Sequence, residues 1–104
     1  MTTLTLDPVD FCKALADDTR QGILRLLQDG EKSVTDIVAE FHLSQPTISH
    51  HLSLLKNNGL VTSRQEGKQI YYALDRENLV ECCGLLLAKF EVVQPKEIEV
   101  RHKR

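Results

Sequence analysis

A change of periodicity in the middle of the chain constrains its fold more than any other feature. Residues 44–58 carry apolar side chains at helical spacing along one face and mostly polar side chains elsewhere. Two short segments rich in β-branched and aromatic residues, 60–64 and 69–74, follow at once and are separated by a turn that contains glycine. The sequence therefore predicts a helix with one polar face, followed directly by a β-hairpin.

Capping residues mark where this helix begins. The Ser44 hydroxyl suits an N-cap, since it can accept a hydrogen bond from a free N–H group of the first turn, and Pro46 lacks an N–H that this turn would leave unpaired. The apolar side chains that follow, Ile48, Leu52 and Leu55, share one face. We expect that face to be buried, with His51 at its edge.

Further helices are predicted on both sides of this region. Helical spacing marks residues 7–16, 18–28 and 33–41, and again residues 76–93, which Pro95 ends. The predicted order is α-α-α-α-β-β-α, a mainly helical fold with a small hairpin, which is the plan of a winged helix-turn-helix. In the last helix we expect an apolar stripe, and in the hairpin an inward face; these are Leu79, Cys83, Leu86, Phe90 and Val93, and Ile70, Tyr72 and Leu74.

The size and composition agree with one domain. With 104 residues, of which 41% are hydrophobic, the chain is expected to form a single globular domain over residues 1–94, with a flexible tail over 95–104. No apolar run approaches the ~20 residues that a membrane-spanning helix needs. An odd count of three cysteines argues against a disulfide framework, and no signal peptide is visible, so we expect a cytoplasmic protein.

The charge is unevenly spread along the chain. The net charge of −2 taken alone argues against a nucleic-acid partner, because DNA-binding domains are usually basic. Residues 1–43 carry four basic and eight acidic side chains, a net charge of −4, and residues 77–104 are balanced. Residues 44–76 carry four basic and two acidic side chains, a net charge of +2. The polar-faced helix and the hairpin thus form the net-positive part of the chain.

The polar face of the helix after Ser44 has the side chains that reading DNA requires. A helix that enters the major groove presents short hydrogen-bonding side chains near its N-terminal end. Gln45 can bond adenine through two atoms, while Thr47 and Ser49 suit base edges or phosphates. We expect the hairpin tip to reach the flanking minor groove or the backbone. The predicted DNA contacts are Ser44, Gln45, Pro46, Thr47, Ser49, His50, Ser53, Lys56, Arg64, Lys68 and Gln69.

Four motifs, in this order and spacing, resemble the ArsR/SmtB family over about residues 7–92. The resemblance implies a homodimeric winged-helix transcriptional repressor whose first and last helices form the dimer interface, and which binds double-stranded operator DNA with an inverted repeat. The motifs are Phe11-Cys12-Lys13-Ala14-Leu15-Ala16-Asp17-Asp18-Thr19-Arg20, Ser44-Gln45-Pro46-Thr47-Ile48-Ser49-His50-His51-Leu52, Asn58-Gly59-Leu60-Val61 and Gly67-Lys68-Gln69-Ile70-Tyr71-Tyr72.

The chain departs from the family at both of its usual effector sites. At the arsenic-type site, Ser33 and Thr35 stand where the family pattern has two cysteines. At the zinc-type site of the last helix, Glu77 and Ala88 stand where the pattern has histidines, which leaves too few nitrogen ligands for zinc. The sequence therefore predicts neither site.

The cysteines are the remaining candidate effector ligands. Cys12 lies in the first predicted helix, whereas Cys82 and Cys83 lie in the last, and these helices are expected to meet at the dimer interface. Together the thiols would suit a thiophilic ion such as As(III), or would pair under an oxidant. The other interpretation is that they serve as small buried hydrophobic side chains. No cofactor is required under either interpretation.

Two other functions stay open. One is an ArsR-type regulator that responds to no effector, which the loss of both standard sites favours. The other is a winged-helix module that binds a protein rather than DNA, which the polar face of residues 44–53 argues against. An enzyme is not expected, because the sequence has no recognisable pairing of a nucleophile with a base and no glycine-rich phosphate loop.

Overall fold

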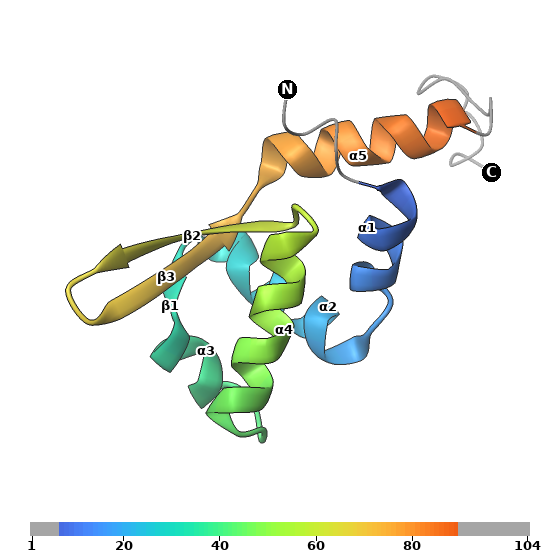
Figure 1. Ribbon diagram of the computed structural model, residues 1–104. Helices are drawn as coiled ribbons and strands as arrows, with labels where there is room; N and C mark the ends of the chain where they lie inside the picture. The colour runs from blue at the N-terminus through green and yellow to red at the C-terminus, as the bar shows by residue number, and fades with distance from the viewer. Residues whose placement is uncertain (1–6, 90–104) are drawn as a thin grey trace.

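The computed structural model describes residues 7–89 and confirms the winged helix-turn-helix order (Figure 1). One short strand that the sequence did not predict, β1, joins the hairpin. The elements are α1 (Pro8–Leu15), α2 (Asp18–Leu26), the 3-10 turn η2 (Leu27–Asp29), β1 (Lys32–Ser33), α3 (Val34–Ala39), α4 (Gln45–Asn57), β2 (Val61–Glu66), β3 (Gln69–Leu74) and α5 (Arg76–Lys89).

Short polar side chains define where four helices begin. Asp7 caps α1, Asp17 caps α2, Ser33 caps α3 and Ser44 caps α4, each by accepting a hydrogen bond from a backbone N–H of the first turn. These caps satisfy donors that the helix itself leaves unpaired, and each contributes about 1 kcal/mol to stability. Local sequence therefore fixes the start of each of these helices.

The hydrophobic core surrounds α4. The helix runs through the middle of the domain with α2 and α3 beside it and the hairpin at its C-terminal end (Figure 1). As predicted, Ile48, Leu52 and Leu55 are fully buried. They pack in one cluster with side chains from α1, α2, η2, α3, the α4–β2 connection, β2 and α5, namely Phe11, Ala14, Ile23, Leu27, Ile37, Leu60, Val61 and Cys82. The opposite face of α4 is left free to contact a ligand.

The sheet has three antiparallel strands in the order β1-β3-β2. The β2-β3 hairpin turns at Gly67, which has a φ of 63°, a conformation that glycine adopts without strain. β1 pairs through two residues only, Lys32 opposite Tyr72 and Ser33 opposite Tyr71. A two-residue strand has no periodicity of its own, so pairing with β3 is what creates it.

Two side chains lie elsewhere than the spacing predicts. Ile70 was expected inside but is 39% exposed, because the hairpin extends beyond the core at this position. In α5, Cys82 rather than Cys83 is buried with the core, and Cys83 is exposed. Adjacent helix residues point about 100° apart, so the core receives only one of the two side chains, and the rotation of α5 about its axis brings in Cys82. Phe90 and Val93 of the predicted stripe lie outside the described residues.

Helix α5 has apolar side chains on two sides. Leu79 and Leu86 pack against the core, whereas Val80, Leu85 and Leu87 are exposed, and Val80 is 73% exposed. The helix lies along one end of the domain, next to α1 (Figure 1). Within residues 7–89, no helix is long and apolar enough to cross a membrane. The second apolar side of α5 thus has no partner within the described protomer.

Candidate DNA-binding surface

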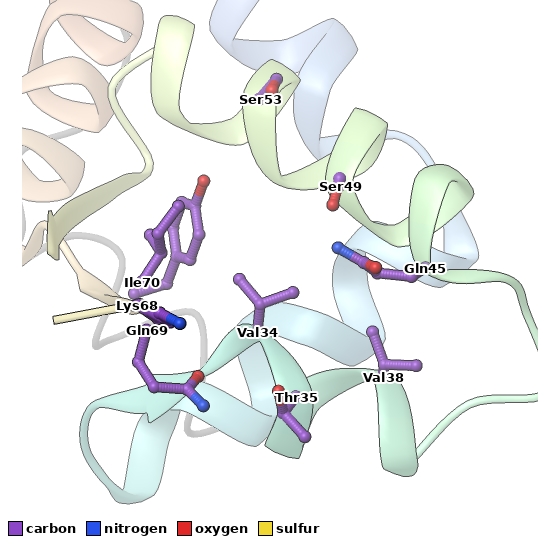
Figure 2. Close-up of a pocket in the computed structure, with 10 residues that line it drawn as sticks. Val34, Thr35, Val38, Gln45, Ser49, Ser53, Lys68, Gln69 and Ile70 are labelled. Atoms are coloured by element: carbon purple, nitrogen blue, oxygen red, sulfur yellow. The ribbon is translucent and has the colours of Figure 1, made fainter. Parts of the chain in front are cut away.

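A groove of about 490 Å³ separates α3 and α4 from the hairpin, here called the wing (residues 61–74). Figure 2 shows its lining: valines of α3 on one side, polar side chains of α4 on another, and wing residues closing it. Lys68 is the only charged side chain in this lining. The lining residues are Val34, Thr35, Val38, Gln45, Ser49, Ser53, Lys68, Gln69, Ile70 and Tyr72.

Three predicted DNA contacts on α4 share this groove. Gln45, Ser49 and Ser53 are four residues apart, so they form one row along the helix (Figure 2). Gln45 and Ser53 are exposed, and Ser49 is partly buried. The row begins in the first turn of α4, where unpaired backbone N–H groups also lie. Donors and acceptors therefore line one side of α4 from its exposed N-terminal end past its middle.

The first turn of α4 is ordered by its own hydroxyl groups. The Ser44 Oγ accepts a hydrogen bond of 3.3 Å from the Thr47 backbone N–H, and its hydroxyl donates one of 3.0 Å to the Thr47 Oγ1. Pro46 occupies the first turn, as predicted. All three side chains are exposed. Their position next to Gln45 leaves them on the same end of the helix as the groove.

Two further predicted contacts, His50 and Lys56, lie on α4 outside the groove. Both are exposed, and Lys56 is in the last turn of the helix. His51, by contrast, has a side chain only 15% exposed, in agreement with the expectation that it packs within the domain. The structure therefore divides the predicted α4 contacts between the groove and a neighbouring exposed strip.

His51 takes part in a network that joins α4 to the end of α1. The Arg20 guanidinium lies with Nη1 3.0 Å from His51 Nδ1, and its Nε donates a 2.7 Å hydrogen bond to the Ala14 carbonyl. Because arginine can only donate, His51 Nδ1 is the acceptor, and the neutral ring carries its proton on Nε2. The Asp17 carboxylate lies 4.0 Å from the same Nδ1. The Arg20 backbone N–H, which bonds this carboxylate, lowers the pKa of Asp17.

The wing residues divide into two groups. Lys68 and Gln69 line the groove, on the side that faces α4. Arg64 was predicted as a DNA contact, but its guanidinium is engaged within the protein. It forms hydrogen bonds with Glu31 and Glu66, and its Cζ lies 4.6 Å from the centre of the Tyr71 ring.

Residues 17–63, which include α2 to α4, match the family model described as "Bacterial regulatory protein, arsR family". The chain is 39% identical over 75 residues to the transcriptional repressor SdpR of Bacillus subtilis, a match that covers 72% of this chain and 83% of that protein. The chain belongs to the ArsR family. This family consists of transcriptional regulators with a winged helix-turn-helix, and not of enzymes.

Two other similar proteins are a repressor and a DNA-binding domain of known structure. The arsenical resistance operon repressor of Escherichia coli is 46% identical over 68 residues, which cover 64% of this chain but only 58% of that protein. The solution structure of a homodimeric winged helix-turn-helix DNA-binding domain from Mycobacterium bovis superposes with a TM-score of 0.65 at 31% identity. That match covers 83% of this chain and 81% of the other.

Several groove residues of this ArsR-family chain were missed by sequence reasoning. Val34, Thr35 and Val38 come from α3, which carried no predicted contact, and Tyr72 and Ile70 were predicted to be core. Tyr72 is half-buried, and burial raises the pKa of its hydroxyl. The groove forms where α3, α4 and the wing meet, so no single segment of sequence predicts it.

The cysteines of this ArsR-family chain differ in environment. Cys12 on α1 is half-buried, Cys82 is buried and Cys83 is exposed. Burial raises the pKa of the Cys82 thiol, which disfavours the thiolate form that binds metals. Within residues 7–89 of one protomer, no three histidine, cysteine, aspartate or glutamate side chains gather to hold a metal ion. A soft-metal site would therefore need groups from beyond this set.

Proposed function

We propose that the protein is a cytoplasmic transcriptional repressor that binds an inverted-repeat operator in double-stranded DNA as a homodimer. The observation that carries this proposal is the row Gln45, Ser49 and Ser53 along one side of α4, which lines the groove together with Lys68 of the wing. A rigid helix with such a row fits the major groove of DNA. A module that binds only proteins would have no need of this polar arrangement.

Apart from Arg64, which is engaged within the protein, the predicted contacts fall into three groups under this proposal. Gln45 reads adenine through its amide, and Thr47 and Ser49 bond base edges or phosphates. Ser44 and Pro46 hold the first turn of α4 against the DNA backbone. The remaining contacts bind phosphates around the base-reading centre and fix the register of the protein on the duplex. They are His50, Ser53, Lys56, Lys68 and Gln69.

The second apolar side of α5 supports the dimer. Val80 and Leu87 directly follow the core-packed Leu79 and Leu86 in sequence, so they point to a different side of α5. Because Val80 and Leu87 are exposed, they leave an apolar surface that a second protomer would cover. The first and last helices are neighbours here, so both would contribute to that interface. Such a dimer presents two copies of α4 about one turn of DNA apart, roughly 34 Å, which suits an inverted repeat.

Release from the operator by a thiophilic effector is the finer part of the proposal. Cys12, Cys82 and Cys83 lie on the two helices that would form the dimer interface, and a relative is an arsenical resistance repressor. An As(III)-like ion would join thiols of both protomers, since one protomer alone supplies no group of three ligands among residues 7–89. An oxidant acting on the exposed Cys83 is the other route. A regulator without an effector is the second candidate, favoured by the burial of Cys82.

A binding measurement on the protein's own promoter region tests the DNA part. Fluorescence anisotropy should show saturable binding to a fragment that contains an inverted repeat, with at least ~10³-fold weaker binding to a scrambled duplex of equal length. The Gln45→Ala variant should lose part of this preference. Binding that is equal for both duplexes, or absent for both, would contradict the proposal and favour a protein-binding module.

A separate measurement tests the effector. Thiol titration of the reduced dimer with and without As(III), read together with operator release, should show thiols protected as DNA is released. Replacing Cys12, Cys82 and Cys83 together by alanine should abolish that release. If the triple variant is released as the parent is, the cysteines are not the sensor. If As(III) and oxidant leave the parent on DNA, the effector-independent regulator is the correct assignment.

A further inference from the structure

The wing carries an arginine, Arg64, whose three guanidinium nitrogens each donate a hydrogen bond to a carboxylate of the protein. Arg64 Nε donates a 2.7 Å hydrogen bond to Glu31 Oε2, and Nη2 donates one of 2.9 Å to Glu31 Oε1. Nη1 donates a third, of 2.6 Å, to Glu66 Oε1. The guanidinium also lies against the Tyr71 ring, with Cζ 4.6 Å from the ring centre. Each nitrogen of this guanidinium is thus bonded to a carboxylate oxygen.

The placement of these residues spans the whole sheet. Arg64 lies on β2 opposite Tyr71 of the central strand β3, whereas Glu31 comes immediately before β1 on the far side. The pairing therefore crosses the central strand and joins the two outer strands over the Tyr71 ring. Glu31 and Arg64 are 33 residues apart in sequence, and β1 itself pairs with β3 at only two positions. The Glu31–Arg64 contact thus adds a side-chain connection between the outer strand of the wing and the segment that leads into β1.

The cluster of Arg64, Glu31 and Glu66 has no excess positive charge with which to attract DNA. One guanidinium between two carboxylates gives the cluster a net charge of −1, which repels a phosphate instead of attracting it. Hydrogen bonds from Arg64 also lower the pKa of the Glu31 carboxyl, so Glu31 stays ionised at neutral pH. Single exposed ion pairs stabilise little, but bidentate arginine geometry within a network is the recognised exception.

We propose that Arg64 is a positioning residue that holds the wing at a fixed angle to the body, with Glu31 as its anchor, and that it does not contact a DNA phosphate. The consequence for operator binding rests on the proposed function; the effect on the wing does not. Under this proposal, a wing held in place brings Lys68 and Gln69 to the DNA already oriented. Loss of the anchor costs affinity because the wing must be ordered on binding.

The sign of one substitution separates this role from that of a phosphate contact. If Arg64 bound phosphate, Glu31 would compete for it, so Glu31→Gln would strengthen DNA binding. If Arg64 is held by Glu31, the same substitution weakens binding. Glu40→Gln is the matched control. Glu40 is exposed at the end of α3, so this substitution removes the same charge without altering the wing.

Operator affinity should be measured for Arg64→Ala, Glu31→Gln and the double variant across a range of salt. We expect each single variant to bind about five- to tenfold more weakly, and the double variant to bind no more weakly than either. The slope of log affinity against log salt should stay that of the parent. Arg64→Lys should resemble Arg64→Ala, because lysine cannot bind Glu31 through two nitrogens.

Stronger binding by Glu31→Gln than by Glu40→Gln would overturn the proposal. So would a salt slope that falls by about 1 for each protomer in Arg64→Ala, since this is the mark of a lost phosphate contact. Unchanged affinity in both single variants would overturn it as well.

A measurement without DNA keeps this test separate from the proposed function. Amide hydrogen exchange at residues 65–70 should be about fivefold faster in Glu31→Gln and Arg64→Ala than in the parent or Glu40→Gln. Unaltered exchange would show that the cluster does not hold the wing. If the parent bound no DNA while the wing amides responded as expected, the proposed function would fail and the anchoring role would stand.

Discussion

The Asn78 side chain donates a 2.8 Å hydrogen bond from Nδ2 to the carbonyl oxygen of Gly59. Asn78 lies in the first turn of α5 and is 4% exposed, whereas Gly59 lies in the connection between α4 and the wing and has a φ of 80°. A second bond, from the Asp75 N–H to the Leu60 carbonyl, runs alongside at 3.0 Å. The start of α5 is thereby fixed to the turn that follows α4.

Asn78→Ala should destabilise the protomer because it leaves the Gly59 carbonyl without its donor in a buried setting. We expect a loss of about 1–3 kcal/mol in the free energy of unfolding, measured by urea denaturation. The buried Asn78 Oδ1 has no hydrogen-bond partner within residues 7–89, so the side-chain bond that the substitution removes is the one from Nδ2. The exposed Glu77→Ala is the control and should change the free energy by less than about 0.5 kcal/mol. Equal stability of parent and Asn78→Ala would contradict this assignment.

Gln45→Ala should relax base preference with little change in salt dependence. We expect a loss of about 1–3 kcal/mol at the adenine it contacts, and nearly unchanged affinity for duplexes that already lack that base. Lys56→Ala is its counterpart and should weaken all duplexes alike, with a salt slope lower by about 1 for each protomer. Anisotropy titrations on single-base operator variants check both. A uniform loss in Gln45→Ala would remove its base-reading role.

The acid stability of the domain should depend on Asp17. Its pKa is lowered from the ordinary value of 3.8, first by the hydrogen bond from the Arg20 N–H. A carboxyl with a lowered pKa in the folded state stabilises the fold at pH values above its unfolded pKa, and this contribution is lost as the pH falls through the folded pKa. Asp17→Asn keeps a capping side chain without the charge, so it should be less stable than the parent at pH 6. The difference between the two stability curves should shrink as the pH falls through the lowered pKa that Asp17 has in the folded state. Parallel curves over that range would exclude the linkage.

Val80→Glu should separate the protomers without unfolding them. Val80 is 73% exposed in the protomer, so a charge there costs little until a partner covers it. Sedimentation should show a dimer for the parent and a monomer at the same concentration for Val80→Glu, with the far-ultraviolet circular dichroism unchanged. Glu81→Gln, an exposed neighbour on α5, should remain dimeric. A dimeric Val80→Glu would place the interface elsewhere.

Local sequence signals predicted the helical scaffold and the polar row on α4. Ser44 and Pro46 located the start of α4, and its apolar spacing identified the buried face, because both signals act within a few residues. Features that depend on distant partners were not predictable in this way. β1 exists through its pairing with β3, and Arg64 is paired with a residue 33 positions away. The exchange of Cys82 and Cys83 reflects helix rotation, which packing against α1 sets.

The Arg20 side chain of α2 connects two other helices, α1 and α4. Its guanidinium donates hydrogen bonds to the carbonyls of Lys13 and Ala14, near the end of α1, and to His51 in the middle of α4. A rotation of either helix about its own axis would therefore have to lengthen or break these bonds. The C-terminal turn of α1 and the helix that carries Gln45 are thus linked through one side chain of α2.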